Sequence, residues 1–98
     1  MPITGGQLSS VPTYDGSTDV ELFIASAISL GAGFGWDDAE LCQATKSCLL
    51  GAGQQWLEAL RKKNITYNIF ENNVANNVVV DIGLRTALIR RFGERISD

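Results

Sequence analysis

Apolar residues recur at helical spacing in several short stretches of this chain, and this recurrence limits the possible folds more than any other feature. Between residues 19 and 30 an apolar side chain returns every three or four positions, which places these side chains on one face of a helix. Residues 37–50 and 52–63 show the same spacing. Such stripes are buried against one another, so we predict an all-α fold, a compact bundle of four to five helices. The first stripe consists of Val20, Phe23, Ile24, Ala27 and Ile28.

The chain length allows one domain. Its 98 residues lie close to the range of about 100–150 residues that is commonest for single domains. Small and polar residues predominate in residues 1–12, so we expect a flexible, extended N-terminal arm there and one helical domain over residues 13–98. Apolar runs are shorter than the ~20 residues that cross a bilayer, and the N-terminus lacks a signal-peptide pattern. We therefore expect a cytoplasmic protein without membrane contact.

A polar cap and a run of glycines mark the expected ends of the first helix. Thr18 is followed three residues later by Glu21, which is the spacing of a capping box, so we expect Thr18 to be the N-cap. Three glycines lie in residues 31–35. We therefore expect the helix to end at about Leu30 and a flexible link to follow.

Two further helices are expected in the middle of the chain. Asp37 and Glu40 form a second capping pair, which predicts a helix that continues to about Leu50. A third helix is expected from about Ala52 to Lys63, where the basic residues of the last turn suit the negative end of the helix dipole. The expected inward residues are Leu41, Ala44, Thr45, Cys48 and Leu49 in the second helix and Ala52, Trp56, Ala59 and Leu60 in the third.

Asparagine is frequent between residues 64 and 77, and it favours turns. We expect a loop there, with one short helix around residues 69–75. The run Val78-Val79-Val80 fits a strand or a helix start, and the surrounding helical spacing favours a last helix from about residue 79 to residue 92. Gly93 is the expected C-terminal stop of that helix. The expected inward residues are Val80, Leu84, Ala87, Leu88 and Phe92.

Histidine is absent from the sequence, which removes the usual general base near neutral pH and the commonest nitrogen ligand of zinc. The two cysteines, Cys42 and Cys48, are too few for a disulfide scaffold and would lie about 240° apart around one helix. We expect two reduced thiols, with Cys48 in the core and Cys42 at its margin. We expect no catalytic residue, no metal and no cofactor, and therefore a protein that is not an enzyme.

Charge is divided unevenly along the chain, although the net charge is only −3. Residues 1–45 contain six acids and no base, whereas residues 61–98 contain seven bases and four acids. This bipolar pattern suits copies that pack with the acidic part of one against the basic part of the next. A solvated surface without such a role is the simpler interpretation. The net acidic charge argues against direct binding of nucleic acid as a main role.

The outward face of the first expected helix carries no charge. Solvent-facing helix surfaces normally carry Lys, Glu or Arg, so this face suits the close approach of another helix. The alternative is an ordinary, modestly polar surface with one exposed leucine. We call it the uncharged face, and its residues are Leu22, Ala25, Ser26 and Ser29.

Three other residues have two interpretations each. Trp36 and Trp56 fit positions in the core, with a ligand groove as the alternative. Arg91 points partly inward on a helical wheel, where its stem packs and its head binds carbonyls or an acid, with RNA contact as the alternative.

The chain carries a series of short motifs in a fixed order. They are Tyr14-Asp15-Gly16, Phe23, Gly35-Trp36, Leu50-Gly51 with Trp56 and Leu60, and finally Leu84, Leu88 and Arg91-Phe92-Gly93. Together they resemble the Gag capsid region of gypsy-type LTR retrotransposons, over about Thr13 to Gly93. The sequence departs from the family pattern at Gly53, where alanine is usual, at Asp81, where tryptophan is usual, and in a longer connection after Leu60.

The resemblance implies a capsid N-terminal lobe of the retroviral and retrotransposon type. Such lobes repeat in hexamers and pentamers to form a shell around the RNA of the element. The implied partners are copies of the same chain, and RNA is contacted only indirectly. Domesticated, Arc-like relatives bind short peptides in a groove under the N-terminal segment. The predicted structural core is Tyr14, Phe23, Trp56, Leu60, Leu84, Leu88 and Phe92.

We therefore expect a structural Gag capsid domain that self-associates through the uncharged face. The alternative is a helical adaptor, either derived from a domesticated Gag protein or unrelated to it, that binds peptide partners. Self-association that depends on concentration favours the shell. A monomer that captures linear peptides favours the adaptor.

Overall fold

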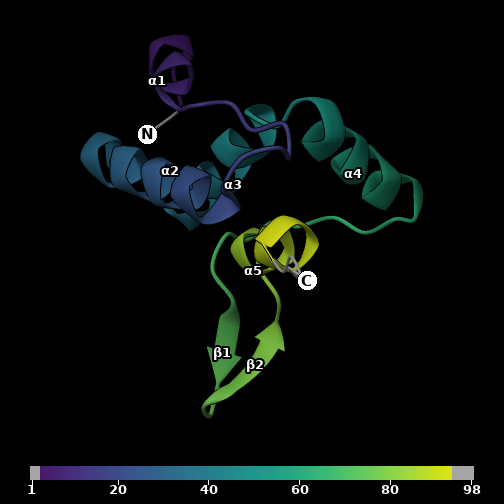
Figure 1. Ribbon diagram of the computed structural model, residues 1–98. Helices are drawn as coiled ribbons and strands as arrows, with labels where there is room; N and C mark the ends of the chain where they lie inside the picture. Colours follow the sequence, from purple (N-terminus) through teal and green to yellow (C-terminus); the bar gives the residue numbers. More distant parts are fainter. Residues whose placement is uncertain (1–2, 94–98) are drawn as a thin grey trace.

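Helices make up most of the structure, a computed structural model that describes residues 3–93 (Figure 1). The helical character predicted from the sequence is confirmed, and a small antiparallel sheet is added to it. The helices are α1 (Gly5–Ser10), α2 (Val20–Phe34), α3 (Asp38–Ser47), α4 (Gly51–Lys62), α5 (Leu84–Leu88) and the π-helical turn η1 (Ile89–Gly93). The strands are β1 (Asn73–Ala75) and β2 (Val78–Asp81).

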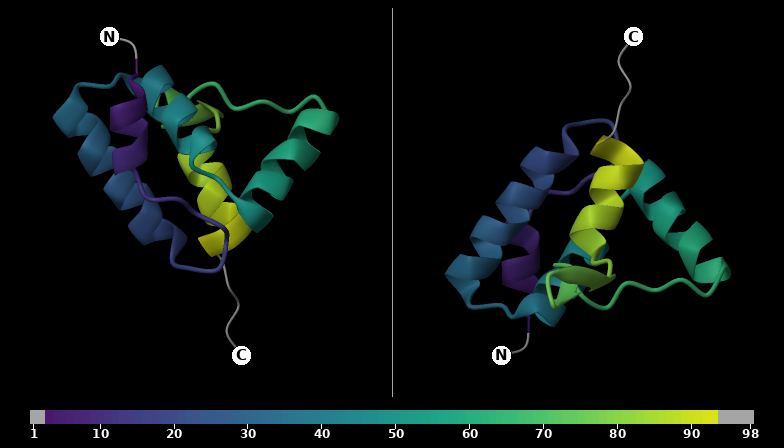
Figure 2. Two further views of the ribbon diagram at one scale, coloured as in Figure 1. Left: turned by 90° about the horizontal axis from the view of Figure 1, so that it is seen from above. Right: turned by 90° about the horizontal axis from the view of Figure 1, so that it is seen from below.

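Helix α5 and the turn η1 lie at the centre of the arrangement. Both views in Figure 2 place them between α2 and α4. The hairpin of β1 and β2 extends away from the helices (Figure 1). Helices α2 and α4 therefore cover opposite flanks of the central element.

Aromatic side chains form the centre of the core. The rings of Tyr14 and Phe23 stack with centroids 5.0 Å apart, and Phe92 meets Tyr14 edge to face at 5.5 Å. Trp56 contacts the same Phe92 ring at 5.8 Å. Most of the predicted core residues are buried, whereas Trp56 and Leu60 are half-buried. The buried ones are Tyr14, Phe23, Leu84, Leu88 and Phe92.

Helix α2 starts one residue later than predicted. Its N-cap is Asp19 and not Thr18, because the Asp19 carboxylate accepts a hydrogen bond of 3.0 Å from the Glu21 N–H. The backbone carbonyl of Thr18 instead accepts a hydrogen bond of 2.9 Å from the Tyr14 hydroxyl. The capping function therefore shifts by one residue, and Thr18 helps to hold the chain before the helix.

Helix α2 also continues beyond its predicted end at Leu30. The helix continues through Gly31, where the Trp36 ring packs closely against the backbone. A Cβ at this position would lie 3.1 Å from that ring. The helix ends after Phe34, where Gly35 adopts a left-handed conformation with φ of 77°. The glycines therefore divide into one that allows a close contact and one that ends the helix.

Two helices begin with a capping box, of which one was predicted. At α3, Asp37 and Glu40 exchange two hydrogen bonds of 2.8 Å, as predicted. At α1, Thr4 and Gln7 exchange the same pair of hydrogen bonds, at 3.1 and 3.0 Å. These contacts satisfy backbone N–H groups at the start of α1. The segment expected to form an extended arm therefore contains a short helix.

The chain after α3 is extended, which ends this helix at Ser47 rather than at the predicted Leu50. The Tyr14 N–H donates to the Cys48 carbonyl at 2.9 Å, and the Tyr14 carbonyl accepts from the Leu50 N–H at 2.8 Å. This pairing also brings the Tyr14 backbone against the start of α4, which explains why residue 53 is a glycine. A Cβ there would lie 3.1 Å from the Tyr14 carbonyl oxygen.

Helix α4 contributes less to the core than predicted. Ala52 and Ala59, expected to face inward, are exposed, and Trp56 and Leu60 are half-buried. Gly53 is the one buried residue of this helix. The physical reason is the direction of α4, which lies close to η1 at its start and diverges from α5 toward its end (Figure 2).

The helix predicted from residue 79 and the short helix predicted around residues 69–75 are wrong, because a hairpin occupies this region. Asn76 and Asn77 connect its strands with φ values of 53° and 64°, the pattern of a two-residue type I′ turn. Asparagine adopts this conformation more readily than most residues, and the flanking valines favour extended backbone. Val80, expected to face inward, is 54% exposed.

The last helix consequently starts at Leu84. The Leu84 N–H donates to the Ile69 carbonyl at 2.9 Å, which holds the helix start against the chain that enters the hairpin. The Asp38 carboxylate at the start of α3 accepts a hydrogen bond of 2.7 Å from the Phe70 N–H. The predicted stop at Gly93 is the last described residue of η1, and the chain after it lies outside the described residues.

Candidate assembly surface

The uncharged face lies on the outer side of α2, opposite the buried stripe. Leu22 is 68% exposed, Ala25 and Ser29 are exposed, and Ser26 is half-buried. Glu21 is the only charged residue within α2. The outer side of this helix therefore lacks the long charged side chains that keep most exposed helices solvated.

Ala25, Ser26 and Ser29 line a shallow depression of about 420 Å³. Leu30, from the same helix, and Pro12, from the chain between α1 and α2, complete its wall. Leu22 does not line it. Pro12 and Leu30 were not predicted as site residues, because no local sequence signal shows where the chain after α1 crosses α2.

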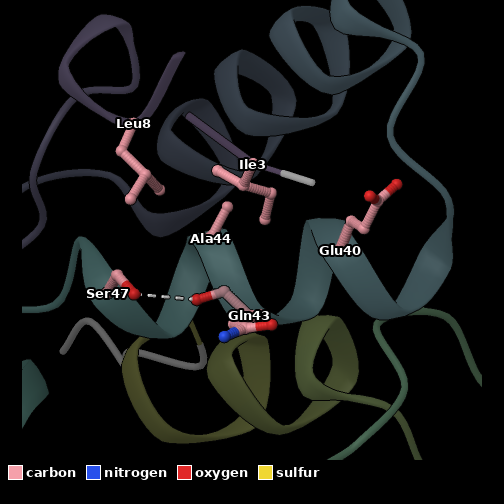
Figure 3. A pocket seen from close by; sticks show the side chains of 6 residues that line it. All are labelled: Ile3, Leu8, Glu40, Gln43, Ala44 and Ser47. Atoms are coloured by element: carbon pink, nitrogen blue, oxygen red, sulfur yellow. Dashed lines mark hydrogen bonds between the residues drawn. The ribbon is translucent and has the colours of Figure 1, made fainter. Parts of the chain in front are cut away.

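A second hollow, of about 350 Å³, lies between the N-terminal segment and α3. Figure 3 shows Ile3 and Leu8 pointing from the N-terminal segment toward Ala44 of α3. The Ser47 hydroxyl at its rim donates to the Gln43 carbonyl at 3.1 Å. This hollow lies at the place where the family resemblance implies a peptide groove. Its lining residues are Ile3, Leu8, Glu40, Gln43, Ala44 and Ser47.

The two tryptophans have different roles. The Trp36 Nε1–H donates to Gln7 Oε1 at 3.2 Å, which ties α1 to the end of α2, and the ring packs against the core. Trp36 therefore fits the packing interpretation. Trp56 fits both interpretations, because it packs against the core and also lines a groove between α4 and α5.

Both cysteines are buried, free thiols. Cys42, expected at the margin of the core, is only 1% exposed, and its thiol lies 3.4 Å from the Tyr67 carbonyl. Burial raises the pKa of Cys42, an effect that the nearby Lys46 charge opposes, and burial also raises the pKa of Cys48. Both thiols are therefore protonated near neutral pH and poorly nucleophilic.

The guanidinium of Arg91 does not lie where the helical wheel predicted it. Arg91 is exposed, and its guanidinium lies 4.9 Å from the centre of the Phe92 ring rather than on a carbonyl or an acid.

In the turn before α2, Ser17 donates two hydrogen bonds to the Asp15 carboxylate, which lower the pKa of Asp15. These hydrogen bonds hold the turn before α2 and do not change the charge of Asp15 near neutral pH, where an aspartate is ionised in any case.

Within residues 3–93 no group of three His, Cys, Asp or Glu side chains lies close enough to hold a metal ion. None of the helices in this part of the chain has the length and apolar character needed to cross a membrane.

Comparison of the chain with protein-family models, with curated proteins and with solved structures found no match.

Proposed function

We propose that this chain is the N-terminal lobe of a Gag-type capsid protein, and that it self-associates to build a shell that packages retroelement RNA. The outer face of α2 is the observation that carries this proposal. Its short, uncharged side chains allow the backbone of a second helix to approach closely, and Leu22 adds apolar area at one end.

The arrangement of the family-like motifs supports the proposal. Tyr14 and Phe23 lie near the start of the sequence and Phe92 near its end, and their rings meet in one aromatic cluster. Trp56 joins the same cluster through Phe92. The residues that carry the resemblance are thus residues that hold this fold together.

The size of the face suits assembly into a shell. Protein interfaces that bury less than about 1,200 Å² of total surface are weak and transient. A contact made through a single helix face belongs to this class. A closed shell needs such contacts, because closure multiplies many weak interfaces and strong ones would trap incorrect assemblies. The proposal therefore requires association that is weak for two copies and cooperative for many.

The test is sedimentation velocity over a series of protein concentrations. We expect the average mass of the unmodified chain to rise above the monomer mass of 10.6 kDa as concentration increases. The variant S26R/S29R should stay monomeric, since its long charged side chains block close approach. The control Q54R/Q55R adds the same charge on exposed positions of α4 and should associate normally. Equal association of both variants would remove the proposed interface.

A peptide-binding adaptor is the second candidate, and the hollow under the N-terminal segment supports it. Its volume of about 350 Å³ falls within the range of about 300–1,000 Å³ that is usual for ligand pockets. A monomer that binds linear peptides, and that loses this binding when Gln43→Arg places a long side chain at the exposed rim, would favour the adaptor over the shell.

A further inference from the structure

A groove of about 240 Å³ lies between α4 and the central helix, on the flank of that helix opposite α2 (Figure 2). Its floor is apolar and comes from four parts of the chain: Trp56 and Leu60 from α4, Tyr67 from the following loop, Ile82 before α5, and Ala87 from α5. Its volume is below the usual range of about 300–1,000 Å³ for small-molecule pockets. The groove therefore suits one or two apolar side chains of a macromolecule.

The floor is held in place by aromatic contacts. The rings of Trp56 and Tyr67 stack with centroids 6.4 Å apart and planes 21° apart. Trp56 also meets the Phe92 ring at 5.8 Å, so the floor is continuous with the core. Ile82 is 37% exposed within it. A preformed apolar floor reduces the ordering cost of binding.

Two exposed arginines, Arg90 and Arg91, form the rim. Neither forms an ion pair with another residue of the described chain, whereas Arg61 pairs with Glu58 at 2.8 Å and Arg85 with Glu71 at 3.1 Å. The rim therefore offers two guanidinium groups that have no carboxylate partner within residues 3–93. An apolar side chain that follows carboxylates complements such a groove.

The chain itself carries a segment of this chemistry. Leu22 is the most exposed of the large apolar side chains in the described part of the chain, at 68%. Asp19 and Glu21, both exposed, precede it at the start of α2. Because α2 and α4 lie on opposite flanks of α5 (Figure 2), Leu22 of α2 and the groove beside α4 belong to different flanks of the same copy. The segment is thus available to a second copy.

We propose that Leu22 of one copy inserts into the groove between α4 and α5 of the next copy, with Asp19 and Glu21 against the arginines of the rim. The occupant of the groove is thus a second copy of this chain. The contact joins two different surfaces, and such head-to-tail contacts close into rings when the rotation between copies allows it. This inference rests on the proposed self-association and names the surface that receives α2.

A charge-reversal mixture tests the pairing. R90E/R91E reverses the rim, and D19S/E21K changes the charge beside Leu22 while serine keeps the N-cap. In sedimentation velocity, each variant alone should associate about tenfold more weakly than the unmodified chain, and their equimolar mixture should regain association as mixed species. The control K62E/K63E has the same change in charge at exposed positions outside the groove and should associate normally.

Disulfide cross-linking tests the geometry without relying on charge. After addition of an oxidant, a mixture of L22C and I82C should give the mixed dimer, whereas A32C, at another exposed position of α2, should not cross-link to I82C. If the unmodified chain does not associate at all, the proposed function fails and this inference with it.

If S26R/S29R abolishes association while the charge-reversed mixture regains none and L22C does not reach I82C, only the proposed pairing is overturned. The unmodified chain is also tested for binding of a single-stranded RNA probe and of a linear acidic peptide. The pairing is overturned if R90E/R91E loses such binding while it self-associates as strongly as the unmodified chain.

Discussion

Gly83 shows how a single residue controls the passage from the hairpin into α5. A Cβ at this position would lie 2.6 Å from the carbonyl carbon of Glu71 and closer still to the carbonyl oxygen of Phe70. Both obstacles are backbone atoms, which cannot rotate away as a side chain does. The Gly83 N–H also donates to Asn72 Oδ1 at 2.8 Å, so the glycine backbone is fixed on both sides.

Gly83→Ala is expected to lower the free energy of unfolding by about 2–3 kcal/mol, because the added carbon forces the backbone apart. The matched control is Gly33→Ala in α2, where nothing lies within 4 Å of the added carbon. The control should raise the stability of the helix by about 0.5–1 kcal/mol. Urea denaturation followed by circular dichroism measures both, and a Gly83→Ala variant as stable as the original chain would contradict the packing.

The buried thiols predict a pH dependence at the alkaline end. Burial raises the pKa of Cys42 and Cys48 in the folded chain, so the folded state keeps protons that the unfolded chain releases. The stability that the two protonated thiols contribute to the folded state is fully present below the unfolded thiol pKa of about 8.5. It is lost as pH rises through the thiol pKa of the folded chain. The unfolding free energy of C42A/C48A should therefore fall less steeply above about pH 8.5. Parallel curves for the two chains would be the contrary result.

At the scale of elements, local signals predicted the starts of α2, α3 and α4 to within about one residue, but not the start of the last helix or how the helices pack. Asp37 and Glu40 mark α3 because a capping box is contained within four residues. Thr4 and Gln7 carry the same signal for α1, within a segment whose small and polar composition favoured an extended arm. The inward residues of α4 were predicted from helical spacing alone, and its divergence from α5 depends on contacts that the local sequence does not encode.

The hairpin replaces the predicted helix because the turn chemistry of Asn76-Asn77 outweighs the helical spacing around it. These two residues stand between Val74-Ala75 and Val78-Val79-Val80, which is the signal for a two-residue type I′ turn. The exposure of the uncharged face, in contrast, follows directly from the helical wheel of α2. The wall residues Pro12 and Leu30 depend on the path of the chain in space, so the sequence predicted the face but not the whole depression.

A pair of substitutions separates the predicted helix from the observed hairpin. The helical prediction placed Val80 and Leu84 on one inward face, whereas the structure exposes 54% of Val80 and none of Leu84. Val80→Thr should therefore change the free energy of unfolding by less than about 0.5 kcal/mol. Leu84→Ala should cost about 2–5 kcal/mol, because it leaves a cavity in the core. Thermal or urea denaturation gives both values, and similar large losses for both variants would support the helix instead.

At the scale of the whole molecule, the central α5 and η1 separate two flanks of different chemistry. The uncharged face belongs to α2 on one flank, and the groove rimmed by Arg90 and Arg91 lies between α4 and α5 on the other. Asp19, at the start of α2, also lies near the end of η1, where it lines a depression with Phe92 and Gly93. One copy thus presents two different surfaces, which is the arrangement that head-to-tail assembly needs.

Electron microscopy of the protein that carries this chain, concentrated in the presence of RNA, tests the central claim most directly. The account predicts closed particles or rings whose walls repeat this lobe, and it predicts their loss in S26R/S29R and not in Q54R/Q55R. A folded protein that stays monomeric, with no regular particle at any concentration, would contradict it.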